Sequence, residues 1–186
     1  MKKSSFWNDA SRCGAVVGAV NVLTSLMGML VPSIAFVTGL INFVATVYLL
    51  FYFTRKRANL FIEEGFTYSQ SLGFIVASAL FVGVVCAVYQ ILASNFLFTD
   101  KLEQQLSTTI AELQKTGVYQ GDMIKQMASM MRSYMFNPIS ILWSQILGNV
   151  LYLGFLGLFI SVGTKREPVL FEIQGSEEQN DESEEE

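Results

Sequence analysis

The chain has 186 residues, of which 52% are hydrophobic and 15% are charged, and its formal net charge is −4. An average soluble domain has about 25% charged residues, so this composition excludes an ordinary soluble domain and favours a membrane protein. The acidic balance comes from the C-terminal end, since eight of the sixteen acidic residues lie at positions 172–186. The remainder of the chain has 12 Lys and Arg against eight Asp and Glu.

The apolar residues are arranged in three long stretches without Asp, Glu, Lys or Arg: residues 13–54, 65–99 and 133–164. A membrane-spanning helix requires about 20 predominantly apolar residues. The first stretch has room for two such helices and each of the others for one. We therefore predict an all-α, polytopic membrane protein with a membrane domain at residues 13–171. Its four transmembrane helices are expected at about residues 13–31, 34–53, 70–98 and 139–162.

The first predicted span carries small residues at spacings of three and four, which places them in one stripe along a helix. Small side chains let two helix backbones approach closely and are common where membrane helices pack. The stripe therefore predicts a helix–helix seam, either within one chain or between two copies. Its residues are Gly14, Gly18, Asn21, Ser25 and Gly28.

Pro32 separates the first two spans, because proline lacks a backbone donor and disfavours helix at the residue before it. The second span ends in aromatic residues from Tyr48 to Phe53, and the cations Arg55, Lys56 and Arg57 follow. Aromatic side chains at headgroup depth with cations beyond them are typical of a membrane interface. This end of the second span is therefore expected at the bilayer surface.

Residues 99–136 are the one sizeable charged segment between spans, and both halves have the periodicity of an amphipathic helix. Two glycines and Asp122 lie between the halves, which favours a turn. We therefore predict an amphipathic helical hairpin between the third and fourth spans. Its candidate interaction face consists of Leu102, Leu106, Ile110 and Leu113 on the first arm and Met123, Met127, Met130 and Tyr134 on the second.

The second arm is rich in methionine, with Met123, Met127, Met130, Met131 and Met135. Thioethers are soft ligands that suit copper(I), whereas methionine is also an adaptable apolar side chain that packs well. Neither cysteine nor histidine accompanies these residues, and four of the five fit a stripe facing the leucine arm. We favour packing and predict no metal site, with copper binding as the alternative.

The distribution of Lys and Arg predicts the orientation in the membrane. Eight of these residues flank the spans on one side, in residues 1–12, 54–69 and 165–166, whereas four lie in residues 99–136. Cytoplasmic segments carry the excess of positive charge. We therefore expect the N-terminus (residues 1–12) and the C-terminus in the cytoplasm and the hairpin outside it. Residues 172–186 lack an apolar anchor and predict a disordered acidic tail, with binding to a basic partner as the alternative.

The predicted spans contain no Asp, Glu, Lys, Arg or His, which are the residues that proton relays and ion pumps place at membrane depth. Amide side chains in the spans either hydrogen-bond between helices or line a substrate path. We favour helix packing for them. These amides are Asn21, Asn42, Gln90, Gln145 and Asn149. The sequence has no nucleophile–base pair, phosphate loop or glycine-rich cofactor turn, so we predict no enzymatic activity, no catalytic residues and no cofactor.

Three features in series resemble a known family. They are the paired spans of the N-terminal half, the segment GFTYSQSLGF at residues 65–74, and the two hairpin arms KLEQQLSTTIAELQKTG and DMIKQMASMMRSYMFNP before the last span. Over about residues 12–166 this order is similar to the bacterial membrane family called domain of unknown function 4199. The resemblance implies a four-helix protein of the bacterial inner membrane. It implies no activity, so no catalytic residue is carried over.

Two functions are compatible with this sequence. The first is a non-enzymatic interaction or accessory protein that uses its outer hairpin and its small-residue seam. The second is a small-molecule transporter or channel that acts as an oligomer, with the five amides lining the path. The expected partners are the lipid bilayer and either a second copy of the chain or another membrane protein, and we expect no nucleic acid.

Overall fold

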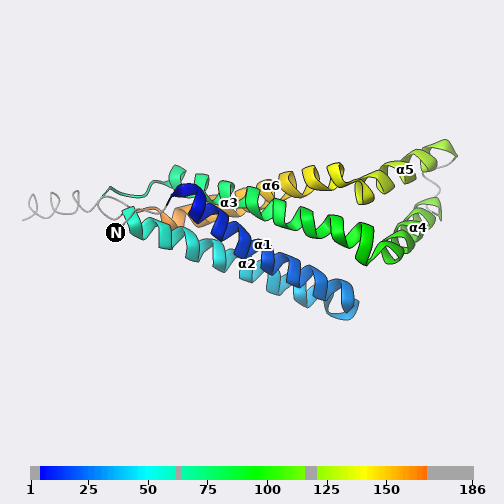
Figure 1. The fold of residues 1–186 in the computed structure, drawn as a ribbon, viewed down its shortest axis with the longest axis horizontal. Helices are drawn as coiled ribbons and strands as arrows, with labels where there is room; N and C mark the ends of the chain where they lie inside the picture. Colours follow the sequence, from blue (N-terminus) through cyan, green and yellow to red (C-terminus); the bar gives the residue numbers. More distant parts are fainter. Residues whose placement is uncertain (1–4, 62–63, 116–120, 167–186) are drawn as a thin grey trace, which may run out of the picture.

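The computed structural model describes residues 5–61, 64–115 and 121–166. The regular structure of these residues is helical, apart from one isolated bridge between Phe66 and Arg166 (Figure 1). The six α-helices are α1 (Phe6–Leu30), α2 (Ala35–Ala58), α3 (Tyr68–Leu92), α4 (Thr99–Lys115), α5 (Asp122–Phe136) and α6 (Pro138–Thr164). The predicted disorder of the acidic tail and the turn at residues 116–120 lie outside the described residues.

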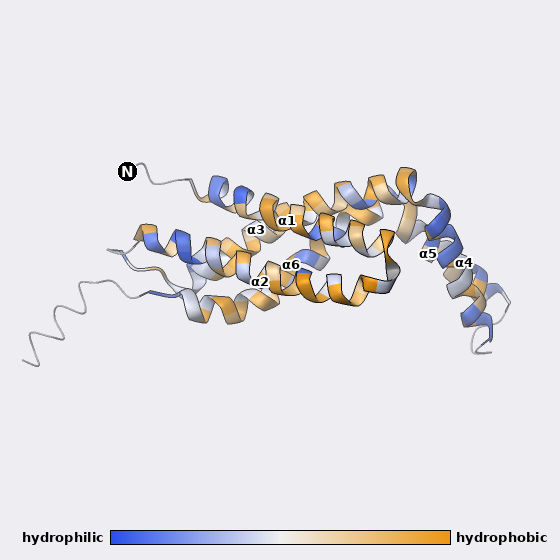
Figure 2. Ribbon diagram, turned by 90° about the horizontal axis from the view of Figure 1, so that it is seen from below, coloured by the Kyte–Doolittle hydropathy of each residue, from blue (hydrophilic) through white to orange (hydrophobic). Residues whose placement is uncertain are grey.

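Four of the described helical segments are long and apolar enough to cross a bilayer: Phe6–Leu30, Ala35–Phe61, Tyr68–Leu97 and Pro138–Thr164. This confirms the predicted all-α class and the four apolar helices. Figure 2 shows these helices as mainly hydrophobic and the α4–α5 hairpin beyond them as mainly hydrophilic. We describe the protein as a multi-pass membrane protein on this basis.

The helices extend beyond the charge-free stretches at one end of the bundle. Helix α1 begins at Phe6 and includes Asp9 and Arg12, and α2 continues through Arg57 to Ala58. The predicted span limits at residues 13 and 53 therefore lie within longer helices. A charged side chain marks the edge of the hydrocarbon, but it does not interrupt the backbone hydrogen bonds of a helix, which continue into the headgroup region.

Helix α3 is the centre of the membrane bundle. It packs against α6 on one side and α1 on the other, while α2 lies mainly against α1. Half of an apolar 18-residue stretch of Tyr68–Leu97 is buried within the protein, compared with 17% of such a stretch in Ala35–Phe61. The pair α1–α2 runs obliquely to α3 and α6, and the two pairs separate toward the end at which α1 turns into α2 (Figure 1). The exposed apolar faces of these helices are suited to contact with lipid chains.

Glycines allow the central contacts. A Cβ atom built on Gly83 of α3 would lie 2.7 Å from the Cα of Ile146 on α6. A Cβ atom built on Gly14 of α1 would lie 2.4 Å from the Cβ of Phe81 and 2.7 Å from the carbonyl oxygen of Ser78, both on α3. No L-residue with a side chain fits at these distances without a backbone shift, so α3 requires glycine at both of its interfaces.

Helices α3 and α4 are joined by a π-helical segment, Ala93–Leu97, in which the Phe98 amide donates to the Ala93 carbonyl at 2.8 Å. The hydroxyls of Ser94 and Thr99 donate to nearby backbone carbonyls at 2.8 and 3.0 Å, which satisfies groups that the wider turn would otherwise leave free. The first hairpin arm therefore leaves α3 at an angle (Figure 1). At the second arm, Asn137 caps α6 by accepting from the Ile139 amide at 2.9 Å.

Candidate functional site

The small-residue stripe of α1 faces two different helices. Gly14 and Gly18 are buried against α3, where Cβ atoms built on them would lie 2.4 Å from Phe81 and 2.9 Å from Val85. Further along, the Asn21 side-chain oxygen accepts from the Thr46 hydroxyl of α2 at 3.2 Å. The predicted seam is thus divided between an α1–α3 contact and an α1–α2 contact.

The rest of the stripe borders an open groove of about 220 Å³ between α1 and α2. Ser25 and Gly28 line it from α1, and Thr38 and Asn42 line it from α2. The side-chain oxygen of Asn42 is buried and has no hydrogen-bond partner among the described residues. This groove is therefore a polar concavity on a surface that is otherwise apolar.

The five amides proposed to line a path are not gathered in one place. Asn21 and Asn42 share the α1–α2 groove. Asn149 donates to the backbone carbonyl of Gln145 at 2.7 Å, so these two residues form a local pair on α6. The backbone carbonyl of Gln90, near the end of α3, accepts from Ser94. A single chain does not bring all five amides to a common cavity.

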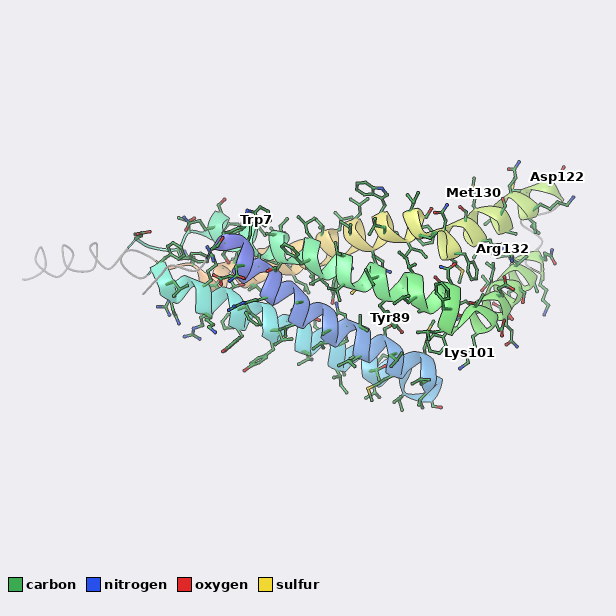
Figure 3. The ribbon with its side chains drawn as sticks, in the orientation of Figure 1. Trp7, Tyr89, Lys101, Asp122, Met130 and Arg132 are labelled. Atoms are coloured by element: carbon green, nitrogen blue, oxygen red, sulfur yellow. The ribbon has the colours of Figure 1, made fainter. Side chains whose placement is uncertain are left out.

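The predicted interaction face of the hairpin is only partly covered. Leu102 and Leu106 on α4 are buried, with exposed fractions of 5% and 8%. On α5, in contrast, Met123, Met130 and Tyr134 are 56%, 71% and 61% exposed. Most of the predicted methionine stripe therefore does not pack on the leucine arm. Figure 3 shows Met130 on the side of α5 that points away from α4.

An ion pair joins the two arms beside an open cavity. Arg132 of α5 donates to Glu103 of α4 at 2.6 Å, and a cavity of about 460 Å³ lies around this pair. A second surface hollow of about 440 Å³ is lined by Met130, Met131, Tyr134 and Met135. Helix α5 thus presents a hydrophobic surface outside the apolar part of the bundle, which is a common property of binding surfaces.

The opposite end of the bundle contains a buried ion pair that the sequence analysis missed. Arg57 of α2 is 8% exposed and donates to the Asp9 carboxylate of α1 at 2.5 Å. The Arg57 guanidinium also lies over the rings of Phe6, Phe61 and Phe74, with its central carbon 5.0–5.5 Å from the ring centroids. Cation–π contact at these distances stabilises a cation that has lost water.

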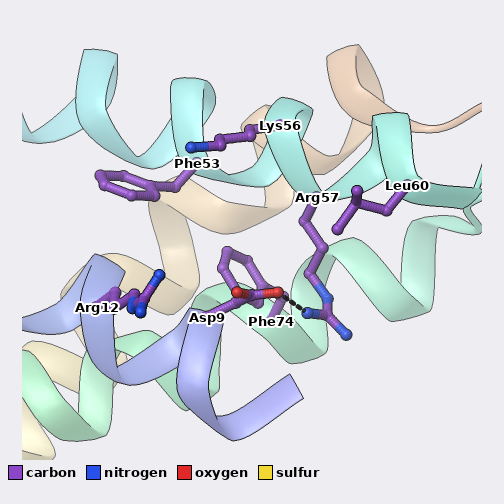
Figure 4. A pocket seen from close by; sticks show the side chains of 7 residues that line it. All are labelled: Asp9, Arg12, Phe53, Lys56, Arg57, Leu60 and Phe74. Atoms are coloured by element: carbon purple, nitrogen blue, oxygen red, sulfur yellow. Dashed lines mark hydrogen bonds and ion pairs between the residues drawn. The ribbon is translucent and has the colours of Figure 1, made fainter. Parts of the chain in front are cut away.

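A cavity of about 90 Å³ opens beside this pair, between α1 and α2 (Figure 4). We call it the cation pocket. Its lining includes Asp9, Arg12, Phe53, Lys56, Arg57 and Leu60. Arg12 and Lys56 are exposed, and neither has an ion-pair partner among the described residues. The pocket therefore combines three cations and one carboxylate with apolar side chains.

The geometry of these sites alone does not indicate a reaction. Comparison with known proteins shows the family to which the chain belongs. Residues 12–166 match the family described as protein of unknown function (DUF4199). The chain belongs to the DUF4199 family. This confirms the resemblance drawn from the sequence and covers the whole described membrane bundle after the first turns of α1. No curated protein and no solved structure matches the chain.

Residues 65–74, one of the three features that carried the resemblance, help to build the cation-rich end of this DUF4199 protein. Thr67 and Gln70 form a capping box that starts α3. The hydroxyls of Ser71 on α3 and Thr164 on α6 lie 2.7 Å apart in a hydrogen bond, and Phe74 is one of the rings around Arg57. Phe74 lies in the first turns of α3, a short link after the cations Arg55–Arg57, and this proximity in the chain was the available signal for the rings around Arg57.

Proposed function

We propose that this DUF4199 protein is a non-enzymatic interaction or accessory protein of the bacterial inner membrane. Its termini lie in the cytoplasm, and the α4–α5 hairpin binds a second membrane protein, or a second copy of the chain, on the outer side. The observation that carries the proposal is the exposed hydrophobic surface of α5, formed by Met123, Met130 and Tyr134 beyond the apolar spans. Such side chains are costly to leave in water and are enriched at binding surfaces.

Two further observations support this function. Methionine adapts its shape to different partners because it is unbranched and polarisable. The polar side chains of the spans are largely used within the chain, as in the Asn21–Thr46, Ser71–Thr164 and Asn149–Gln145 hydrogen bonds. The membrane bundle thus has the properties of a scaffold for the hairpin.

The test is a photo-crosslinking amino acid placed at Met130, with a matched position at Glu112 on the exposed polar side of α4. Both variants are expressed in cells and crosslinked in their native membranes. We expect one defined adduct from position 130 and none from position 112. Replacing residues 102–134 by a short linker is expected to abolish the complex while membrane insertion is retained. Unchanged co-purification of the partner with this deletion variant would contradict the proposal, and the mass of the adduct from position 130 distinguishes a second copy from another protein.

The α1–α2 groove favours a second candidate, a small-molecule transporter or channel that acts as an oligomer. Asn21, Thr38 and Asn42 provide polar groups at membrane depth, and the buried Asn42 oxygen has no hydrogen-bond partner among the described residues. The test is flux into liposomes that contain the purified protein. Substitution of all five amides by leucine is expected to abolish flux if they line the path, so unaffected flux would remove this candidate.

A further inference from the structure

We infer that the cation pocket between α1 and α2 binds the phosphate of an anionic phospholipid. This site is at the opposite end of the molecule from the hairpin, so the inference is independent of the proposed function. The pocket lies where α2 passes from its aromatic residues into Arg55–Arg57, which is the order of side chains expected at headgroup depth. A lipid phosphate is therefore present at this level of the membrane.

The charges of the pocket select an anion. Arg57 is held in place by Asp9 and by three aromatic rings, so its position is fixed before a ligand arrives. Arg12 of α1 and Lys56 of α2 also line the pocket (Figure 4). After the Asp9–Arg57 pair is discounted, these two cations remain uncompensated among the described residues. Basic pockets between membrane helices recognise anionic headgroups in this way.

The size and the apolar lining of the pocket favour a lipid as the source of the phosphate. Its volume of about 90 Å³ is several times the roughly 10–15 Å³ that one water molecule needs. Phe53 and Leu60 line the same cavity, and Leu60 is 42% exposed. Side chains of this kind suit the glycerol and first acyl carbons of a phospholipid, whereas a free phosphate ion has no apolar part to bury.

The test uses the full chain purified in a neutral detergent and titrated with phosphatidylglycerol or phosphatidylcholine, with bound lipid counted by native mass spectrometry. The pocket variant is Arg12→Gln with Lys56→Gln. Each cation near an anionic lipid contributes about 1 kcal/mol, or about fivefold in affinity. We therefore expect saturable binding of phosphatidylglycerol in preference to phosphatidylcholine, weakened about 25-fold in the pocket variant.

The matched control is Arg55→Gln with Lys165→Gln, which removes two exposed cations from the same end of the molecule but outside the pocket. The two double variants have equal net charge and an equal charge bias for membrane orientation. Binding is expected to change by less than about threefold in the control, because solvent screens charges outside the pocket. Equal weakening in both variants would overturn the inference, since it would show general attraction to the surface.

Two further experiments test recognition by charge and the source of the phosphate. The charge-conserving variant Arg12→Lys with Lys56→Arg is expected to retain binding, and loss of binding there would contradict recognition by charge. Inorganic phosphate and glycerol 3-phosphate are added at millimolar concentration as competitors. Retention of bound phosphatidylglycerol supports the lipid, whereas its stoichiometric displacement would overturn the lipid assignment in favour of a soluble phosphate. Circular dichroism and gel filtration verify that each variant is folded.

Discussion

Two ion pairs of this protein have similar lengths and different energetic roles. Arg57 and Asp9 are 2.5 Å apart with side chains that are 8% and 21% exposed, while Arg132 and Glu103 are 2.6 Å apart and 66% and 47% exposed. An exposed pair contributes about 0–1 kcal/mol. Removing one partner of a buried pair costs about 3–5 kcal/mol, because the other charge is left without compensation. Arg57 is therefore the residue that fixes α1 to α2 at the cation-rich end.

The Arg57→Gln substitution is expected to lower the free energy of unfolding by about 3 kcal/mol, since it removes the ion pair and the contacts with three rings. Its matched control is Arg55→Gln, which removes the same charge two residues earlier from an exposed position and is expected to change stability by less than about 0.5 kcal/mol. Denaturation in detergent, followed by circular dichroism, measures both. Equal losses of stability in the two variants would show that Arg57, with its ion pair and surrounding rings, is not a structural anchor.

At the scale of the elements, glycines determine which helices are neighbours. Helices α1, α2 and α6 have similar apolarity and α3 is the most apolar, but apolarity does not say which helices pack against each other. Gly14 and Gly83 open the two sides of α3 to a backbone approach, and α3 becomes the central helix for that reason. Gly148 and Gly39, in contrast, have no atom within 4 Å of a built Cβ, so the presence of glycine alone does not identify a seam.

The substitution Gly83→Ala is expected to lower stability by about 1–3 kcal/mol, because its Cβ would lie 2.7 Å from the Cα of Ile146. Gly148→Ala is the matched control in a helix of the same bundle, and it is expected to be neutral or stabilising by up to about 1 kcal/mol, since alanine is the better helix former and nothing lies within 4 Å. Thermal denaturation of both variants in the same detergent measures these changes in stability. A destabilised Gly148→Ala with an unaffected Gly83→Ala would contradict the described α3–α6 contact.

At the scale of the whole molecule, charge and hydrophobic surface are segregated along its long axis. The start of α1, the end of α2 and the end of α6 lie at one end, together with Arg12, Arg55–Arg57 and Lys165, while α4 and α5 lie at the other (Figure 1). From the positive-inside rule we predict that the first end lies in the cytoplasm. The cation pocket then meets the inner leaflet, where anionic lipid attracts cations.

This orientation predicts the accessibility of introduced cysteines to a membrane-impermeant maleimide. Thr108→Cys on α4 is expected to react in intact cells, whereas Ser5→Cys is expected to react only after permeabilisation. Both positions are exposed, and the native thiols of Cys13 and Cys86 lie within the spans, so the unmodified chain provides the background. Labelling of Ser5→Cys in intact cells would contradict the orientation.

Local properties of the sequence were sufficient for the elements and insufficient for their contacts. The breaks at Pro32 and Asn137, the four apolar helices and the two hairpin arms follow from residues that are close in the chain. The Asp9–Arg57 pair joins residues 48 positions apart, and nothing near either residue specifies the other. The direction of the methionine stripe was also unpredictable, because periodicity identifies one face of a helix but does not say what that face contacts.

Apolar length and backbone hydrogen bonding are local requirements of a bilayer, so the sequence was sufficient to predict a multi-pass membrane protein and the segments long enough to cross a membrane. The tertiary structure alone decided that α3 is central, that α5 leaves Met130 and Tyr134 exposed, and that Arg12 and Lys56 meet at one pocket. In lipid, apolar residues have similar surroundings whether or not they contact another helix, so the burial of apolar side chains does not determine which helices pack together. Close approach at glycines and a few polar contacts select them instead.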